Sequence, residues 1–126
     1  MAKVAKKEVN KEAHIQRVAD WVKARGFSDI KANLEGYEKP ITFGRQQDGE
    51  SFIPDVTGKQ FEQKSYFEVI LKTDDLDKLT SKLKLLGQLA AVRGGNLYLM
   101  IPKGNLPFAK TLMTNTRITA EMINLL

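Results

Sequence analysis

Two carboxylates stand in apolar surroundings near the middle of the chain. Asp55 follows Pro54 at the end of an apolar run, and Glu68 lies between Phe67 and Val69 in a β-rich run. An ionised carboxylate in such a setting is costly unless it is paired or bound to a metal. Two of them on neighbouring strands would repel each other unless a cation lay between them. The pattern therefore predicts a site for a hard divalent ion, Mg²⁺ with Mn²⁺ as a substitute.

Each carboxylate also has an ordinary structural explanation. A glutamate in a strand can face solvent on an antiparallel sheet, and an aspartate near a strand end often forms a turn. The combination favours chemistry, because Glu68, Ile70 and Lys72 share one face of a strand whose side chains alternate. A lysine is therefore expected on the side of the Glu68 carboxylate.

Hydrophobic spacing predicts the elements that would position these residues. Apolar residues at helical spacing predict a first helix over 11–25, which Asn10 caps and Gly26 ends. Alternation predicts a strand over 30–34, a short edge strand over 41–43, a loop over 44–50, and a hairpin or meander from the runs 52–56 and 66–72.

The second half of the chain predicts helices that alternate with strands. Asp74 or Asp75 can cap the strongest helix of the chain, which Gly94 ends. A continuous apolar run then predicts a buried strand over 97–101, and a helix is expected over 105–114. The segment 118–122 fits either an edge strand or a helical turn. The fold class is therefore α/β, a mixed sheet flanked by helices in the order α-β-β-β-α-β-α-β.

Composition limits the classes of function that remain. The chain has 126 residues, 42% of them hydrophobic, which suits one domain over 10–126 after a basic N-terminal tail, residues 1–9. It has no cysteine, no signal-peptide core and no apolar run of the roughly 20 residues that span a bilayer. A cytoplasmic protein without a membrane partner is expected. The net charge of +5 weakly favours a polyanionic partner.

The central motif resembles a known family. Pro54 and Asp55, Glu68 on the next strand, a lysine-containing helix and an apolar strand are similar to the core of the PD-(D/E)xK nucleases, across residues 10–104. The resemblance implies a restriction-endonuclease-like fold in which Asp55 and Glu68 bind one or two Mg²⁺ ions. It also implies DNA as the partner, hydrolysis of its phosphodiesters, and pairing into a homodimer.

The motif lysine is missing from its usual place. That family carries a lysine two residues after the glutamate, where this chain has Ile70. Lys72 lies one pleat further along the same face, about 6 to 7 Å away. Lys82 lies on the following helix, from which some members of the family supply the lysine. Both positions stay open, and each also suits an ordinary solvated lysine.

Two further residues have weaker support. The resemblance suggests Glu12 as an additional carboxylate and Gln88 as a substrate contact, although Glu12 also suits a helix N-terminus and Gln88 an ordinary surface. Three functions follow for testing: a Mg²⁺-dependent nuclease that uses Asp55, Glu68 and Lys72 or Lys82; a degenerate nuclease fold that binds nucleic acid or a protein without cleavage; and a structural or dimerising module.

Overall fold

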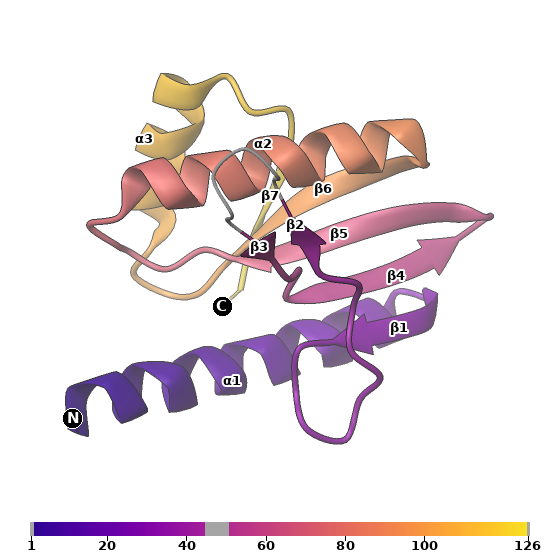
Figure 1. Cartoon of the computed structure of the whole chain (residues 1–126), viewed down its shortest axis with the longest axis horizontal. Helices are drawn as coiled ribbons and strands as arrows, with labels where there is room; N and C mark the ends of the chain where they lie inside the picture. Colours follow the sequence, from indigo (N-terminus) through magenta and orange to yellow (C-terminus); the bar gives the residue numbers. More distant parts are fainter. Residues whose placement is uncertain (1, 45–50, 126) are drawn as a thin grey trace.

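The protein is a mixed α/β structure with a five-stranded sheet and three helices (Figure 1). The structure, a computed structural model, describes the backbone of residues 2–44 and 51–125 and the side chains of 11–44 and 51–125. In chain order the elements are α1 (Ala2–Ala24), β1 (Ser28–Ala32), β2 (Phe43–Gly44), β3 (Ser51–Phe52), β4 (Val56–Gln60), β5 (Gln63–Val69), α2 (Leu76–Val92), β6 (Gly94–Ile101), α3 (Leu106–Thr116) and β7 (Glu121–Asn124).

The main sheet has the strand order β1-β4-β5-β6-β7. The pairs β1–β4 and β4–β5 are antiparallel, whereas β5–β6 and β6–β7 are parallel. Each parallel pair requires a crossover, which α2 provides between β5 and β6 and α3 between β6 and β7. The strands β2 and β3 form a separate two-stranded ribbon. The predicted mixed sheet is confirmed, and the final segment is an edge strand.

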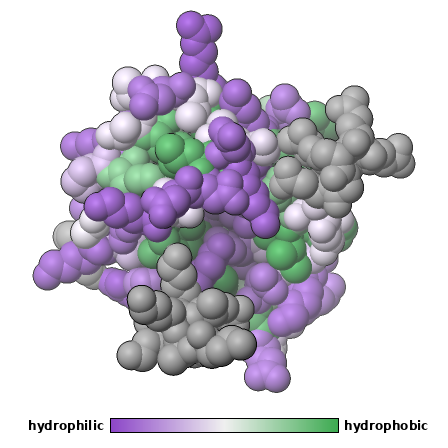
Figure 2. All heavy atoms as spheres, turned by 60° about the vertical axis from the view of Figure 1, so that its left-hand side comes forward, coloured by the Kyte–Doolittle hydropathy of each residue, from purple (hydrophilic) through white to green (hydrophobic). Residues whose placement is uncertain are grey.

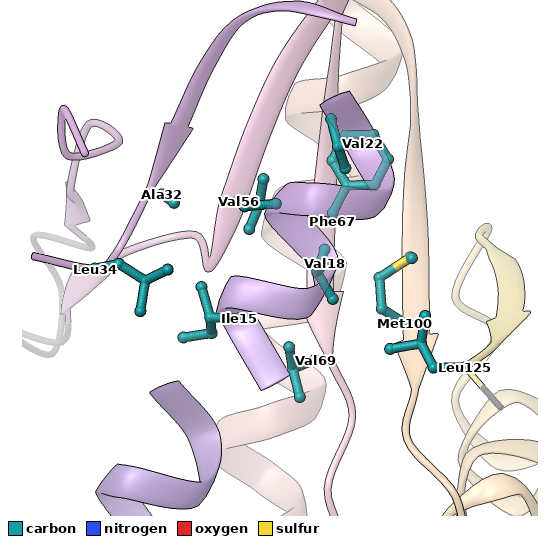
Figure 3. Close-up of a cluster of buried hydrophobic side chains, with 11 residues drawn as sticks. Ile15, Val18, Val22, Ala32, Leu34, Val56, Phe67, Val69, Met100 and Leu125 are labelled. Carbon is teal, nitrogen blue, oxygen red and sulfur yellow. The ribbon is translucent and has the colours of Figure 1, made fainter. Parts of the chain in front are cut away.

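Two hydrophobic cores lie on opposite faces of the sheet. The core on the α1 side includes Val18, Val22, Phe67 and Met100, and the sticks in Figure 3 show them between α1 and the strands. The core on the side of α2 and α3 consists of Tyr66, Ile70, Leu83, Leu86, Ala90, Leu97, Leu99, Ile101, Ala109, Leu112 and Ile118. The sheet therefore separates the two cores.

The alternation of β5 decides which way Glu68 points. Phe67 and Val69 belong to the core beside α1, whereas Tyr66 and Ile70 belong to the core beside α2. Glu68 has the parity of Tyr66 and Ile70 and therefore faces α2. The predicted shared face of Glu68 and Ile70 is confirmed.

The first helix is longer than the spacing predicts. It begins at Ala2, so Asn10 lies inside it instead of capping it, and residues 2–9 have helical backbone. Alanine and lysine have high helix propensity, which explains how the helix extends beyond the apolar stripe. Gly26 follows the helix with φ +86° and ends it as predicted.

Several strand boundaries differ from the predicted ones. Phe52 ends β3, whereas β4 begins at Val56, so the run 52–56 is not one strand. Pro54 explains the break, because it has no N–H to give to a strand ladder. Asp55 therefore precedes its strand, and Lys72 lies beyond the end of β5 at Val69. Only Phe43 of the predicted strand 41–43 belongs to β2. Most of the predicted loop 44–50 lies outside the described residues.

The turn between β4 and β5 has an unusual backbone. Phe61 and Glu62 connect the paired residues Gln60 and Gln63, and both have left-handed φ angles, 54° and 66°. A two-residue turn of this kind normally takes Asn-Gly, because side chains disfavour that region. The Phe61 side chain gains no burial in return, since it is 88% exposed.

Gly95 lies where β6 approaches β5 most closely. The register of this parallel pair shifts between Lys64 and Tyr66, and a Cβ atom on Gly95 would overlap the carbonyl group of Lys64. Glycine is therefore required at this position. Within the described part of the chain, no helix has the length and apolar character to cross a membrane.

Candidate functional site

Asp55 and Glu68 hold each other through reciprocal hydrogen bonds. The Asp55 backbone N–H donates to Glu68 Oε2 at 2.6 Å, and the Val69 N–H donates to Asp55 Oδ2 at 2.9 Å. Both residues are almost completely buried. Each carboxylate thus uses one oxygen to fasten the neighbouring segment and keeps its other oxygen for a further partner.

Lys82 is the partner that the two remaining oxygens share. Its Nζ lies 2.6 Å from Glu68 Oε1 and 3.9 Å from Asp55 Oδ1. Lys11 on α1 approaches Asp55 Oδ1 from the other side, at 3.4 Å. The Lys82 side chain is 15% exposed and that of Lys11 41%, so Lys82 is the more deeply placed of the two cations. The oxygens that a metal would need therefore converge on one ammonium group.

The amphipathic pattern of α2 places Lys82 at this point. Leu83, Leu86 and Ala90 are buried against the sheet, and Lys82 lies four residues before Leu86 on the border of this stripe. The helix start is fixed by Asp75, whose side chain accepts a hydrogen bond from the Lys78 N–H.

Burial controls the charge state of the pair. Burial, together with the nearby Asp55 charge, raises the pKa of Glu68 to about 7 against the opposing effects of Lys82 and the Asp55 N–H. Burial lowers the pKa of Lys82, yet its attraction to Glu68 and Asp55 outweighs this and raises the pKa above its ordinary value. Lys82 is therefore a cation at neutral pH.

Asp55 Oδ1 and Glu68 Oε1 are donors of the kind that Mg²⁺ takes. Mg²⁺ binds through one or two carboxylates and keeps several of its waters, and in this structure the Lys82 ammonium group lies at the position that these two oxygens share. Among the residues whose side chains are described, no group of three or more acidic, histidine or cysteine residues surrounds a common point. An ion at this site would therefore rely on two carboxylates and its own waters.

A pocket of about 520 Å³ opens beside the acidic pair. Figure 2 shows this side of the molecule, where hydrophilic atoms surround a hollow with hydrophobic atoms in its wall. The pocket is lined by the cations Lys11, Lys72, Lys78 and Lys82, the acid Asp75, and Ser51, Phe52, Ile53, Val69, Leu71, Thr73 and Leu79. Two of the lining lysines, Lys11 and Lys82, also contact Asp55. A phosphate in this pocket would meet an excess of positive charge beside the carboxylates.

The other residues proposed from the sequence lie outside the pair. Lys72 is an exposed residue at the pocket, and its backbone N–H donates to Asn105 Oδ1 at 2.9 Å. Glu12 is exposed and lines a separate pocket of about 330 Å³. Gln88 lines a larger groove, about 1220 Å³, between α2 and the segment 115–121. That groove does not include Asp55, Glu68 or Lys82.

The contact between Lys11 and Asp55 was not anticipated from the sequence. A signal for it exists, because Lys11 lies four residues before Ile15, a residue of the buried stripe on α1. Residues four apart share one face of a helix, so Lys11 lies on the face that packs on the sheet, and its long side chain can reach Asp55.

Comparison of the chain with protein-family models, with curated proteins and with solved structures finds no match. The chemical interpretation of the site therefore rests on its own geometry.

Proposed function

We propose that this chain is a Mg²⁺-dependent nuclease-like domain that acts on DNA phosphodiesters. In this proposal Asp55 and Glu68 are the metal ligands, and Lys82 takes the role of the motif lysine, whose usual position is occupied by Ile70. The observation that carries the proposal is the position of Lys82 Nζ within 4 Å of one oxygen on each of the two carboxylates.

The topology supports a restriction-endonuclease-like fold. Asp55 stands at the start of β4 and Glu68 lies within the adjacent antiparallel β5. The crossover helix α2 then carries the lysine back to the pair, and the buried strand β6 follows it. This is the element order that the resemblance of the central motif implies.

Hydrolysis at this site would form a bond from a water oxygen to phosphorus and break the bond to one ester oxygen, which leaves with a proton. A bound Mg²⁺ would supply Lewis-acid stabilisation of the phosphate and a more acidic water. Lys82 stays protonated at neutral pH, so it stabilises negative charge that develops on the phosphate oxygens and does not act as the base. Asp55 and Glu68 position the ion and Lys82 together.

The lysines of the pocket suit the phosphates that flank the reacting one. Lys11 and Lys82 lie at the carboxylates, while Lys72 and Lys78 lie further along the pocket wall. Phosphate contacts from lysine are strong and independent of base sequence. This arrangement supports DNA as the substrate class without a sequence preference from these residues.

A second function is favoured by the same ion pair. Lys82 already neutralises the carboxylate charge, so the site is stable without a metal and suits a degenerate nuclease fold that binds nucleic acid or a protein without cleavage. The two functions differ in whether Asp55 is needed for a chemical step.

A cleavage assay separates the two functions. Supercoiled, linear, branched and single-stranded DNA are incubated with Mg²⁺ or Mn²⁺ and either the wild-type protein or Asp55→Asn. Asparagine keeps an oxygen for the Val69 N–H, so the fold is retained while the charge is lost. Glu12→Gln is the matched control, because Glu12 is an exposed carboxylate away from the pair.

The nuclease proposal requires that the wild-type protein cut DNA in a metal-dependent way. It also requires that Asp55→Asn abolish this cutting and that Glu12→Gln preserve it. Cutting that survives in Asp55→Asn would place the chemistry elsewhere. DNA binding without cutting, equal in all three proteins, would establish the second function instead.

A further inference from the structure

The β4–β5 turn carries an aromatic side chain that is not buried in either hydrophobic core. Phe61 is 88% exposed, and both turn residues hold left-handed backbone angles that cost stability. A single exposed apolar residue is common, but a strained turn that presents one without burying it is not explained by folding. The position of this turn on the molecule is therefore informative.

The base of the turn is surrounded by positive charge. Lys59 and Lys64 are directly paired across β4 and β5, where like charges normally repel. Burial lowers the pKa of Lys64, and the charges that act on it are three cations, Lys31, Arg93 and Lys59, and one carboxylate, Asp29. The cluster holds more cations than carboxylates. Lys64 itself is buried, with its Nζ over the Tyr66 ring, whereas Arg93 is exposed and Lys59 is partly exposed with its Nζ 3.7 Å from Asp29 Oδ2.

Figure 1 places the turn at one end of the long axis of the molecule, with the last turns of α1 and α2 at the same end. Gln60 Nε2 donates to the Arg25 carbonyl at 3.1 Å, which ties the turn to the end of α1. On the other side, Lys64 pairs with Gly94, the residue after Arg93. The turn that carries Phe61, the end of α1 and the residue that follows α2 thus lie at one end of the molecule.

We propose that Phe61 stacks on an unpaired base of a nucleic acid while Lys59 and Arg93 contact the phosphates beside it. The choice of nucleic acid as the partner follows from the combination of an exposed aromatic face with clustered cations, which is the chemistry of single-strand binding. It extends the proposed function from the cleavage site to a second contact at the opposite end of β5, and it rests on that function for the partner class.

The spacing of the two contacts sets the length of the substrate. Gln63 and Glu68 are five residues apart on β5, which corresponds to about 17 Å at about 3.3 Å per residue. A strand with a rise of about 3.4 Å per nucleotide covers this distance with about five nucleotides. The favoured DNA therefore has an unpaired nucleotide about five positions from the bond at the acidic pair.

Fluorescence anisotropy in EDTA tests the contact without cleavage. Two labelled DNAs of equal length are compared, a blunt duplex and a forked duplex with unpaired arms, against wild type, Phe61→Ala, Phe61→Trp and Ile41→Ala. Ile41 is another exposed apolar side chain and is the matched control. Stacking predicts that Phe61→Ala weakens forked-DNA binding at least about fivefold and blunt-duplex binding less than about twofold. Phe61→Trp and Ile41→Ala should bind forked DNA as wild type does.

The salt dependence of binding tests the cations. Arg93→Gln should lower the slope of log affinity against log salt by about one, whereas Lys110→Gln on α3, at the other end of the molecule, should not. Equal affinity of Phe61→Ala and wild type for forked DNA, or an equal loss on both DNAs, would overturn the inference.

The outcomes also distinguish this inference from the proposed function. If the wild-type protein cuts DNA but Phe61→Ala binds forked DNA as wild type does, the cleavage site stands and the stacking contact is refuted. If Phe61→Ala weakens the binding of forked DNA but the wild-type protein never cuts, the stacking contact stands and the nuclease function is refuted. If wild type binds no DNA, the inference fails and the turn is better assigned to a protein partner.

Discussion

Glu68 shows how one residue combines a structural and a chemical role. Its Oε2 accepts the Asp55 N–H, and its Oε1 pairs with Lys82. The same burial that makes these bonds strong raises the pKa of the carboxyl to about 7. The carboxyl therefore exchanges its proton near neutral pH, and in the proposed function it would have to lose that proton before it could bind Mg²⁺.

This raised pKa predicts a pH dependence of stability for the metal-free protein. A carboxyl whose pKa is higher in the folded state contributes stability below its ordinary pKa, and this contribution is lost as pH rises through about 7. The free energy of unfolding should carry a Glu68 component that falls by roughly 2–3 kcal/mol between pH 4.5 and pH 8. Urea unfolding in EDTA at these pH values measures it.

The variant Glu68→Gln isolates this component. Glutamine keeps an oxygen for the Asp55 N–H but cannot ionise, so the fall with pH should disappear. Glu12→Gln should keep the wild-type fall, and His14, which titrates in the same range, is present in every protein. An unchanged pH profile in Glu68→Gln would show that the carboxyl ionises at its ordinary pKa.

The choice between Lys82 and Lys72 gives a second prediction at this scale. Lys82→Gln retains a donor for Glu68 but removes the charge, and should lower kcat/KM for DNA cleavage by a factor of about 100 or more. Lys72→Gln should change it by less than about threefold, because Lys72 lies at the pocket and not in the ion pair. Steady-state cleavage rates, with thermal melting to confirm folding, provide the measurement. A larger loss in Lys72→Gln would reverse the assignment.

Sequence reasoning identified the pair but could not choose the lysine. Alternation along the strand was sufficient to place Glu68 and Ile70 on one face, since period-two patterns are local. The distance from Lys82 to that carboxylate depends on how α2 crosses the sheet, which is a property of packing and not of spacing. Lys72 was a candidate only because β5 was expected to continue past Val69, where it ends.

At the scale of elements, local breakers explain both the successes and the errors. Gly26 ends α1 and Asp75 begins α2 as predicted. The position of Gly26 requires a positive φ, and the Asp75 side chain caps an N–H group at the start of its helix. Pro54 was included in a strand that it interrupts. The ribbon β2–β3 was not predicted, because two-residue strands leave no periodic signal.

Alanine substitutions at two glycines should have opposite effects on the free energy of unfolding, because only Gly95 lies at the close contact between β5 and β6. Gly95→Ala should lower the free energy of unfolding by about 3 kcal/mol, since its Cβ would overlap the Lys64 carbonyl and the strands must separate. Gly87→Ala on α2 is the control, because a Cβ there meets only ordinary contacts, and alanine favours the helix by up to about 1 kcal/mol. Chemical denaturation distinguishes the two, and equal stabilities would mean that the strands accommodate the methyl group freely.

The whole molecule consists of two cores that share one sheet. Ile15 belongs to the core beside α1 and Ile101 to the core beside α2. Since the sheet lies between them, the two cores are expected to respond independently to small losses of volume. This arrangement is a consequence of the strand order, which places helices on both faces.

Double-variant measurements test this independence. Ile15→Val and Ile101→Val should each cost about 1 kcal/mol, and the double variant should equal their sum within about 0.5 kcal/mol. The matched pair Ile70→Val with Ile101→Val lies within one core and should deviate from additivity by more than this. Strong coupling between Ile15 and Ile101 would show that the sheet transmits packing changes between its faces.

The reciprocal hydrogen bonds of Asp55 and Glu68 have a consequence for how this lineage can change. Because each carboxylate accepts a backbone N–H from the segment of the other, losing either one endangers folding. Losing Lys82 would leave the two buried carboxylates without their shared cation, so a descendant released from selection for cleavage would keep all three residues. Survival of the acidic pair and its lysine among relatives of this chain would therefore not by itself report an active enzyme.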